Sequence, residues 1–188
     1  FFNPGSYITN HLGIRGTSLN SKISVYSSLQ LTKEEGVVKM VNGIERANVR
    51  LNVDYRILDN LIFSTSNLYT HTKADNRASG VFGALFRSDP GADLLAANSD
   101  GSPYQVNANR IENIVNPLYS IANSRNESTM EKLLSHFSLR YNPTEYLTLS
   151  TAFGTTRSVG ENLYLTPKGR LRYDLTPEVG YISRGMWR

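Results

Sequence analysis

The sequence predicts an all-β chain, an antiparallel segment of a transmembrane β-barrel with about 6 to 8 strands. Apolar and polar residues alternate in segments of about ten residues, and short and long connections alternate between these segments. The 188 residues have a mean hydropathy of −0.35, and no apolar run approaches the roughly 18 residues that a membrane-spanning helix needs. Barrel strands need apolar residues only at every second position, so they fit such a composition.

The alternation is clearest between Ala47 and Ile57. Apolar residues stand at Ala47, Val49, Leu51, Val53, Tyr55 and Ile57. Polar and charged residues stand between them, at Asn48, Arg50, Asn52, Asp54 and Arg56. Successive side chains of a strand point to opposite faces. This segment therefore predicts a strand with one apolar and one polar face.

Other segments share this pattern or are rich in β-branched and aromatic residues, which favour strands. These predicted strands cover residues 7–16, 23–32, 61–72, 133–142 and 147–156. The last part of the chain, residues 168–188, is assigned to no element.

The predicted connections differ strongly in length. Short turns fall at residues 19–21, 58–60 and 142–145, whereas residues 33–45 and about 73–129 form long connections and another long segment follows Arg157. Bacterial barrels have tight turns at the periplasmic rim and long loops outside the cell. Residues 73–129 are therefore predicted to be a long extracellular loop, with a helical turn at residues 93–97, and loops of that length are usually functional or disordered.

Catalytic and metal-binding motifs are absent from the sequence, which predicts neither an enzyme nor a cofactor. The chain has no cysteine, and its histidines, His11, His71 and His136, stand far apart, as expected of polar side chains inside or at the rim of a barrel. Three aspartates share the long loop without the spacing of a calcium-binding loop, so a calcium site there stays open. These are Asp89, Asp93 and Asp100.

The charges are scattered rather than gathered into a basic patch. The chain carries 20 basic and 16 acidic residues, a net charge of +4. Nucleic acid is therefore not an expected partner. The tyrosines near the predicted short turns favour an aromatic girdle at a membrane boundary, although ordinary β-propensity accounts for them too. They are Tyr55, Tyr141 and Tyr146.

The runs at residues 21–30, 35–38 and 45–54 resemble the first barrel hairpins of SusC/RagA-type TonB-dependent transporters. The matching positions are Tyr26, Ser28, Gly36, Arg46, Asn48, Arg50 and Asn52. That family also has a long loop that ends near an Asn-Pro pair, and Asn116-Pro117 resembles it. The resemblance covers the chain up to about Pro167, but the spacing from Tyr26 to Gly36 is one residue longer than the family pattern.

The resemblance implies the bacterial outer membrane and a barrel of about 22 strands with a plugged lumen. It implies import of oligosaccharides or peptides, energy from the TonB complex and a SusD-like surface lipoprotein as lid. All of residues 1–188 would then belong to one barrel domain, in contact with outer-membrane lipid. The plug domain would lie outside this chain, which is expected to be a piece of a longer protein.

The candidate site residues are the polar ones predicted to face the lumen, against the plug or along the substrate path. They are Arg50, Asn52, Asp54, Arg56 and Arg140. An alternative is a soluble or surface-displayed β-domain that binds glycan or a partner protein. In that case the apolar face would form the core of a sandwich.

Overall fold

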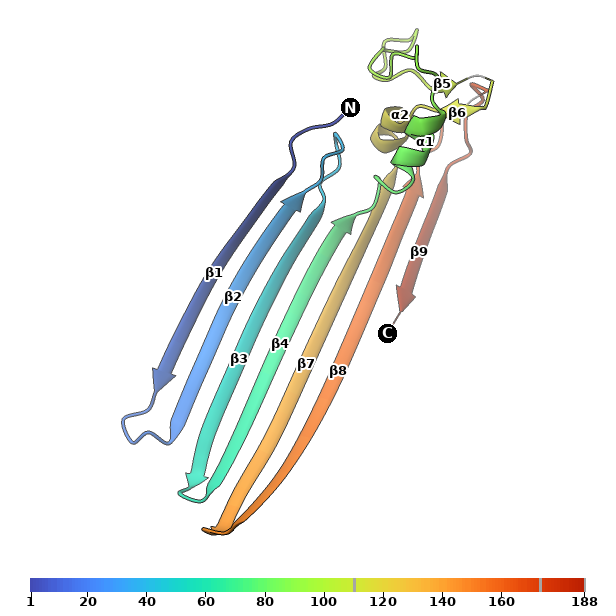
Figure 1. Ribbon diagram of the computed structural model, residues 1–188. Helices are drawn as coiled ribbons and strands as arrows, with labels where there is room; N and C mark the ends of the chain where they lie inside the picture. Colours follow the sequence, from blue (N-terminus) through green and yellow to red (C-terminus); the bar gives the residue numbers. More distant parts are fainter. Residues whose placement is uncertain (110, 173, 188) are drawn as a thin grey trace.

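The computed structural model describes residues 1–109, 111–172 and 174–187. Their main feature is one antiparallel sheet of seven strands in the order β1-β2-β3-β4-β7-β8-β9 (Figure 1). The strands are β1 Ser6–Thr17, β2 Ile23–Glu35, β3 Ile44–Leu58, β4 Leu61–Asp75, β7 Arg125–Thr144, β8 Leu147–Thr166 and β9 Tyr181–Trp187. The fold prediction is thus confirmed in part: the chain is mostly β with one antiparallel sheet, which is open and does not close into a barrel.

The pairing register gives this sheet two chemically different faces. Leu29 pairs with Val49, and Val49 pairs with Tyr69, so these apolar side chains share one face. Ser28 pairs with Arg50 on the opposite face. We call the face with Val49 the apolar face and the face with Arg50 the polar face. The two faces predicted for residues 47–57 therefore extend across the sheet.

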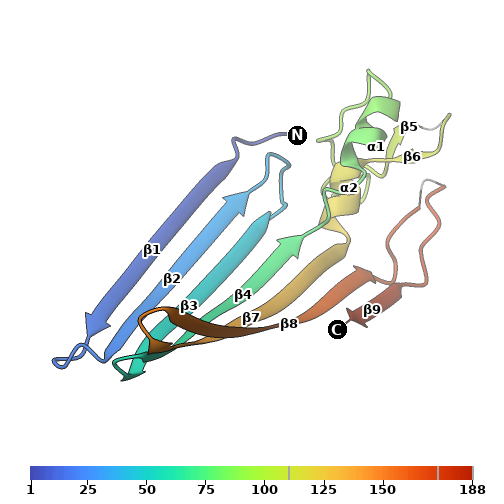
Figure 2. The ribbon, with the colours of Figure 1, turned by 60° about the horizontal axis from the view of Figure 1, so that its bottom comes forward.

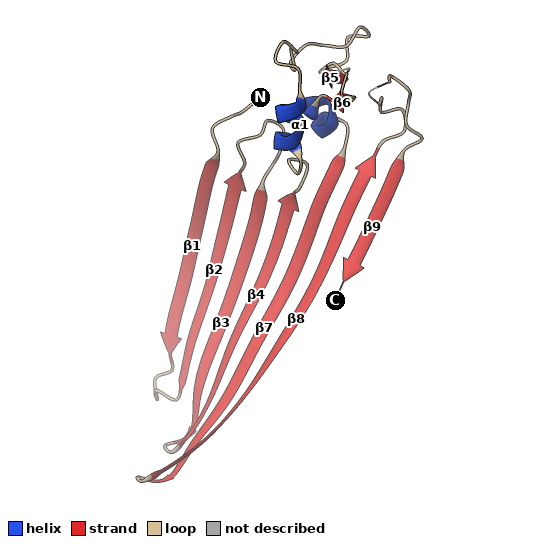
Figure 3. Ribbon diagram, turned by 45° about the vertical axis from the view of Figure 1, so that its right-hand side comes forward, coloured by secondary structure: helices blue, strands red, loops and turns tan. Residues whose placement is uncertain are grey.

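The short and long connections lie at opposite ends of the strands, as predicted (Figure 3). The short turns are residues 18–22, 59–60 and 145–146, and the connections at the other end are residues 36–43, 76–124 and 167–180. The strands extend further than predicted, and β9 occupies part of the unassigned last segment. Sequence alternation fades near strand ends, which explains why these bounds were underestimated.

The described residues of the three long connections pack together, and we call this packed unit the cap (Figure 2). It contains α1 Val81–Arg87, β5 Asn107–Asn109, β6 Ile114–Val115 and α2 Pro117–Ala122. Residues 93–97 hold one hydrogen-bonded turn, from Ala96 N to Asp93 O at 3.2 Å. Within the ranges that the structure describes, no helix is long and apolar enough to cross a membrane.

The cap contains all the buried hydrophobic side chains of the described chain. They are Val38, Val41, Val81, Val106, Ala108, Ile114, Leu118, Tyr119 and Ile121. The sheet, in contrast, is a single layer whose apolar face carries half-exposed residues such as Leu51. The cap therefore has a core of its own, whereas the apolar face of the sheet has no protein layer over it in this part of the chain.

Asn116 holds the centre of the cap. Its side chain is fully buried, accepts a hydrogen bond from Leu118 N at 3.0 Å, and donates to Leu94 O at 2.9 Å. Its backbone N–H donates to Val106 O at 2.7 Å. Asparagine is a favoured N-cap residue, and Pro117 after it fits the first position of α2. One side chain thus starts α2 and fixes the loop around Leu94.

We predict that Asn116→Ala loosens the cap, because it removes the N-cap bond and leaves Leu94 O buried without its donor. Each loss costs on the order of 1–2 kcal/mol. Hydrogen-exchange mass spectrometry should show faster exchange across residues 94–122. Ser99→Ala, an exposed position in the same connection, is the control and should leave exchange unchanged. Equal protection in both variants would contradict the role of Asn116.

Candidate functional site

The five candidate residues share the polar face of the sheet. Arg56 and Arg140 both pair with Ile62, so they flank β4 from its two sides. Asn52 Oδ1 accepts a hydrogen bond from Ser66 Oγ at 2.8 Å. Asp54 lies between Asn52 and Arg56 along β3, and Arg50 lies nearer the cap. The structure thus places them on one face, and their assignment to a barrel lumen stays a prediction.

Arg50 lies between two shallow cavities of the polar face. One, of about 270 Å³, is also lined by His11 and Tyr26, and the other, of about 390 Å³, by Ser66 and His136. Gly154 lines the second cavity, and a Cβ atom there would make ordinary van der Waals contact with His136 Nδ1 at 3.8 Å. The sequence predicts these two histidines only as polar side chains inside or at the rim of a barrel, and not as neighbours of Arg50. Their parity within the strands was the signal that places them beside Arg50.

Cations outnumber carboxylates on the polar face. The cations are Arg15, Arg46, Arg50, Arg56, Lys132 and Arg140, and the carboxylates are Glu34 and Asp54. In the described part of the chain none of these cations takes part in an ion pair. Such a surface attracts anions, and concave walls focus its field. The polar face is therefore electropositive.

The charges on the apolar face are arranged differently. Most of them stand near the cap and are paired: Lys33–Glu35 at 2.8 Å, His71–Glu131 at 3.6 Å, Lys73–Glu127 at 3.5 Å, Arg125–Glu127 at 2.8 Å and Arg184–Glu161 at 2.6 Å. Glu45 and Arg157 take part in no ion pair within the described residues. Exposed pairs of this kind contribute little to stability, because water screens them. Their main effect is that this rim of the sheet presents little unbalanced charge.

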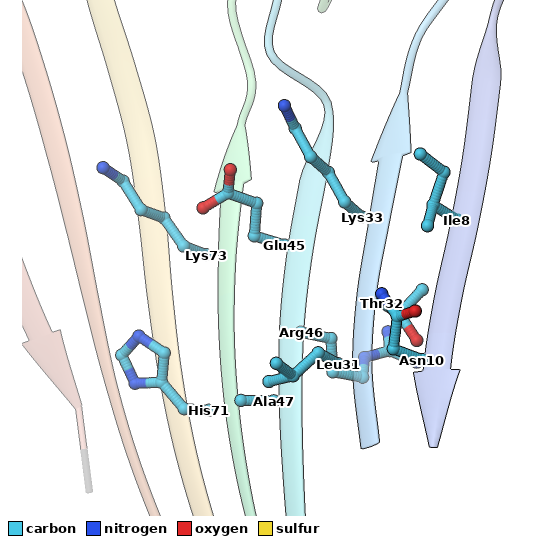
Figure 4. Close-up of a pocket in the computed structure, with 10 residues that line it drawn as sticks. All are labelled: Ile8, Asn10, Leu31, Thr32, Lys33, Glu45, Arg46, Ala47, His71 and Lys73. Atoms are coloured by element: carbon cyan, nitrogen blue, oxygen red, sulfur yellow. The ribbon is translucent and has the colours of Figure 1, made fainter. Parts of the chain in front are cut away.

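A groove of about 430 Å³ lies where the apolar face meets this rim (Figure 4). Ala47 lies between Leu31 and His71 on the neighbouring strands, and its small side chain leaves a space between theirs that forms the floor of the groove. Lys33 and Lys73 stand above it with Glu45 between them. Apolar floor and charged rim meet along one line, as at a boundary between an apolar medium and water.

That boundary does not keep one level across the whole sheet. Lys33, Glu45 and Lys73 pair with one another, so the boundary is level across β2, β3 and β4. The first charged residue above the apolar stripe is two residues lower on β7, at Glu131, and four residues lower on β8, at Arg157. The boundary therefore descends toward the short turns only on β7 and β8.

Aromatic residues occupy the part of the apolar face nearer the short turns. Phe137 stacks with Phe63 and with Phe153, each pair at 6.5 Å between ring centroids. Tyr55 and Tyr141 lie on the same face near the short turns. Tyr146 lies in the short turn between β7 and β8, and its side chain is almost fully exposed. Their role as a girdle stays a prediction.

The three loop aspartates are each used by their own turn. Asp89 Oδ1 accepts from Gly91 N, and Asp93 Oδ1 accepts from Leu95 N, both at 2.9 Å. Asp100 Oδ1 accepts from Ser102 N at 2.9 Å. These are side-chain turns typical of aspartate. Across the described ranges no cluster of His, Asp and Glu could hold a metal ion.

Asp75 and Arg77 join the sheet to the cap. Arg77 Nη2 lies 2.7 Å from Asp75 Oδ2, and Arg77 also donates to the carbonyls of Met40 and Ile121. Burial raises the pKa of Asp75, but the hydrogen bonds from Arg77 and from Asn42 N outweigh burial and hold that pKa below its usual range. The pair thus ties residues 36–43, the end of β4 and α2 together.

The comparisons with known proteins give one informative match. No protein-family model matches the chain. A TonB-dependent receptor of Formosa agariphila, named TonB-dependent receptor P26, is 28% identical over 155 residues. The chain is a distant homologue of a TonB-dependent receptor.

The match covers most of this chain and little of the relative. The aligned residues make up 80% of the chain and 14% of the receptor. The chain thus spans only a small part of the length of the curated relative that it matches. A single open sheet with a cap is consistent with a segment of a barrel wall.

We predict that the Asp75 carboxylate makes the cap sensitive to acid. Because its folded-state pKa is depressed, its contribution is complete above the ordinary value of about 3.9 and is lost as pH falls through the lowered value. Corrected for intrinsic rates, exchange protection of residues 36–43 should be constant from about pH 7 to 5 and fall below about pH 4. Asp75→Asn should reduce it above about pH 4, and the two proteins should converge at lower pH.

The control is Asp59→Asn in the short turn between β3 and β4, at the far end of the sheet. It should leave the protection of residues 36–43 unchanged. A fall in protection between about pH 7 and 5, or the same profile in Asp75→Asn, would contradict the role given to Asp75.

Proposed function

We propose that this chain forms part of the barrel wall of a SusC/RagA-type TonB-dependent transporter. The transporter imports large nutrients, oligosaccharides or peptides, across the bacterial outer membrane. A SusD-like surface lipoprotein covers its extracellular face, and the TonB complex supplies energy. The distant homology supports a TonB-dependent receptor. The hairpin motifs around Tyr26 and Arg50, which resemble those of the SusC/RagA type, support the subfamily.

The observation that carries the proposal is an apolar face that no protein layer covers in the described chain and that ends in charged residues near the cap. A soluble sandwich would bury such a face under a second sheet. A bilayer can cover it instead, and the charged residues then stand where the strands leave the membrane. In this orientation the short turns lie in the periplasm and the cap lies outside the cell.

The polar face then lines the lumen. Arg50, Arg56 and Arg140 contact the plug or the passing substrate, with Asn52 and Asp54 between them. For any one of these residues plug packing is the simpler role, since a plugged lumen brings the wall against the plug along most of its height. The cap, which has its own core, provides an ordered surface for the lipoprotein lid or the substrate.

We predict that Val53→Arg on the apolar face impairs assembly in the membrane. An arginine on the lipid face of a barrel costs about 2–4 kcal/mol at the midplane and less toward the interfaces, so a cost below that range is expected at Val53, two residues from Tyr55. The fraction of the native-length protein folded in outer membranes should fall, measured by heat-modifiable migration on gels. Asn52→Arg is the matched control, because it places the same side chain on the polar face of the same strand.

Asn52→Arg should assemble at the normal level. Equal assembly of the two variants would remove the distinction between a lipid face and a lumen face. A Val53→Arg protein that folds normally and is soluble without detergent would favour the rival β-domain.

Import itself is tested by deletion of the gene in the bacterium that encodes it. Growth on at least one polysaccharide or peptide source should be lost, while growth on the corresponding monomers continues. Growth should return with a plasmid copy of the gene only when TonB is present. Unchanged growth on every polymer, or rescue without TonB, would refute the proposed transport.

A further inference from the structure

A pocket of about 220 Å³, lined by both polar and apolar residues, lies where the cap meets the sheet. Asn126 on β7 and Tyr164 on β8 pair with each other and both line it. Asn126 is an even number of residues from Arg140 on β7, and Tyr164 is an even number from Ser150 on β8, so both side chains lie on the polar face. The pocket therefore opens on the polar-face side, where the strands enter the cap. Ser120 of α2 and Arg170 of the last connection complete it.

Arg170 brings an unbalanced positive charge into this pocket. Its Nη2 donates to Ser120 Oγ at 3.1 Å, and its Nε is buried without a hydrogen-bond partner. Arg170 takes part in no ion pair within the described residues, and none of the described residues that line the pocket is a carboxylate. The second arginine there, Arg77, is neutralised by Asp75. The guanidinium of Arg170 thus has no counter-ion within the described residues, and an oxyanion bound in the pocket would supply one.

The other lining groups suit a sugar. Serine hydroxyls and asparagine amides donate and accept hydrogen bonds, and Tyr164 lies beside Tyr181 with 6.2 Å between ring centroids. Ligand sites typically combine aromatic surface with a few placed polar groups. A pocket of this size accepts about one monosaccharide unit rather than a chain.

We propose that the pocket binds an acidic sugar unit, with its carboxylate or sulfate on Arg170 and its ring beside Tyr164. The inference rests on the proposed import function, whose substrate class it narrows to acidic glycans. The electropositive polar face below the pocket has the sign that such a glycan needs for passage.

The test uses the native-length protein purified in detergent and two matched probe pairs. One pair is trigalacturonate and its methyl ester, and the other is a sulfated galactose trisaccharide and its desulfated form. Calorimetry should show tighter binding of at least one acidic form than of its neutral partner. Arg170→Gln should weaken that acidic probe about tenfold or more and leave the neutral probe unchanged. Arg170→Lys should retain part of the preference.

Arg172→Gln is the matched control, since Arg172 is exposed and lies 3.7 Å from Glu178 outside the pocket. It should bind like the unaltered protein. Exchange protection of residues 36–43 checks that the cap of each variant is folded. The probe pair whose acidic form binds more tightly shows whether the pocket takes a carboxylate or a sulfate.

Two results would overturn the inference: no acidic probe that binds better than its neutral form, or a preference that survives Arg170→Gln. If TonB-dependent growth on a polymer persists beside either result, the import function stands without the acidic site. If Arg170-dependent binding is present but growth never depends on the gene, the import function fails and the pocket remains.

Discussion

A single-layered sheet with two unlike faces needs two unlike surroundings, and this constraint governs the rest of the structure. The unbroken antiparallel register carries Leu29, Val49 and Tyr69 to one side and Arg50 to the other. A shift by one residue in any strand would exchange the faces of that strand. The hydrophobic effect then favours an apolar surrounding on one side only, and in the proposed function a bilayer provides it on the scale of a whole sheet.

The two faces also treat charge differently. On the apolar face, charges such as Lys33 and Glu35 occur near the cap and mostly in pairs, as suits a rim that meets both a membrane and water. On the polar face, Arg50, Arg56 and Arg140 lack ion-pair partners within the described residues. Unpaired cations at a wall are available to a partner, whether plug or substrate.

The sheet could be predicted from the sequence because strand periodicity is local. Residues 47–57 alone fixed the two faces, and the short turns fixed which ends meet. The cap could not be predicted, because Asn116 bonds to Leu94 and Tyr119 accepts from Leu171 N, contacts between segments far apart in the chain. The same holds for the candidate site: Arg50 follows from alternation, whereas Arg170 lies in a segment without periodicity and was missed.

The bonds of Arg77 and Tyr119 have a mechanical consequence. They fasten residues 36–43, residues 76–124 and residues 167–180 to one another, so these connections share a core and cross-links instead of hanging from the rim separately. Any motion that opens the rim must then carry them as one body. A ligand that meets an ordered surface of this kind loses less conformational entropy in the protein on binding, so even a weak contact is preorganised for capture.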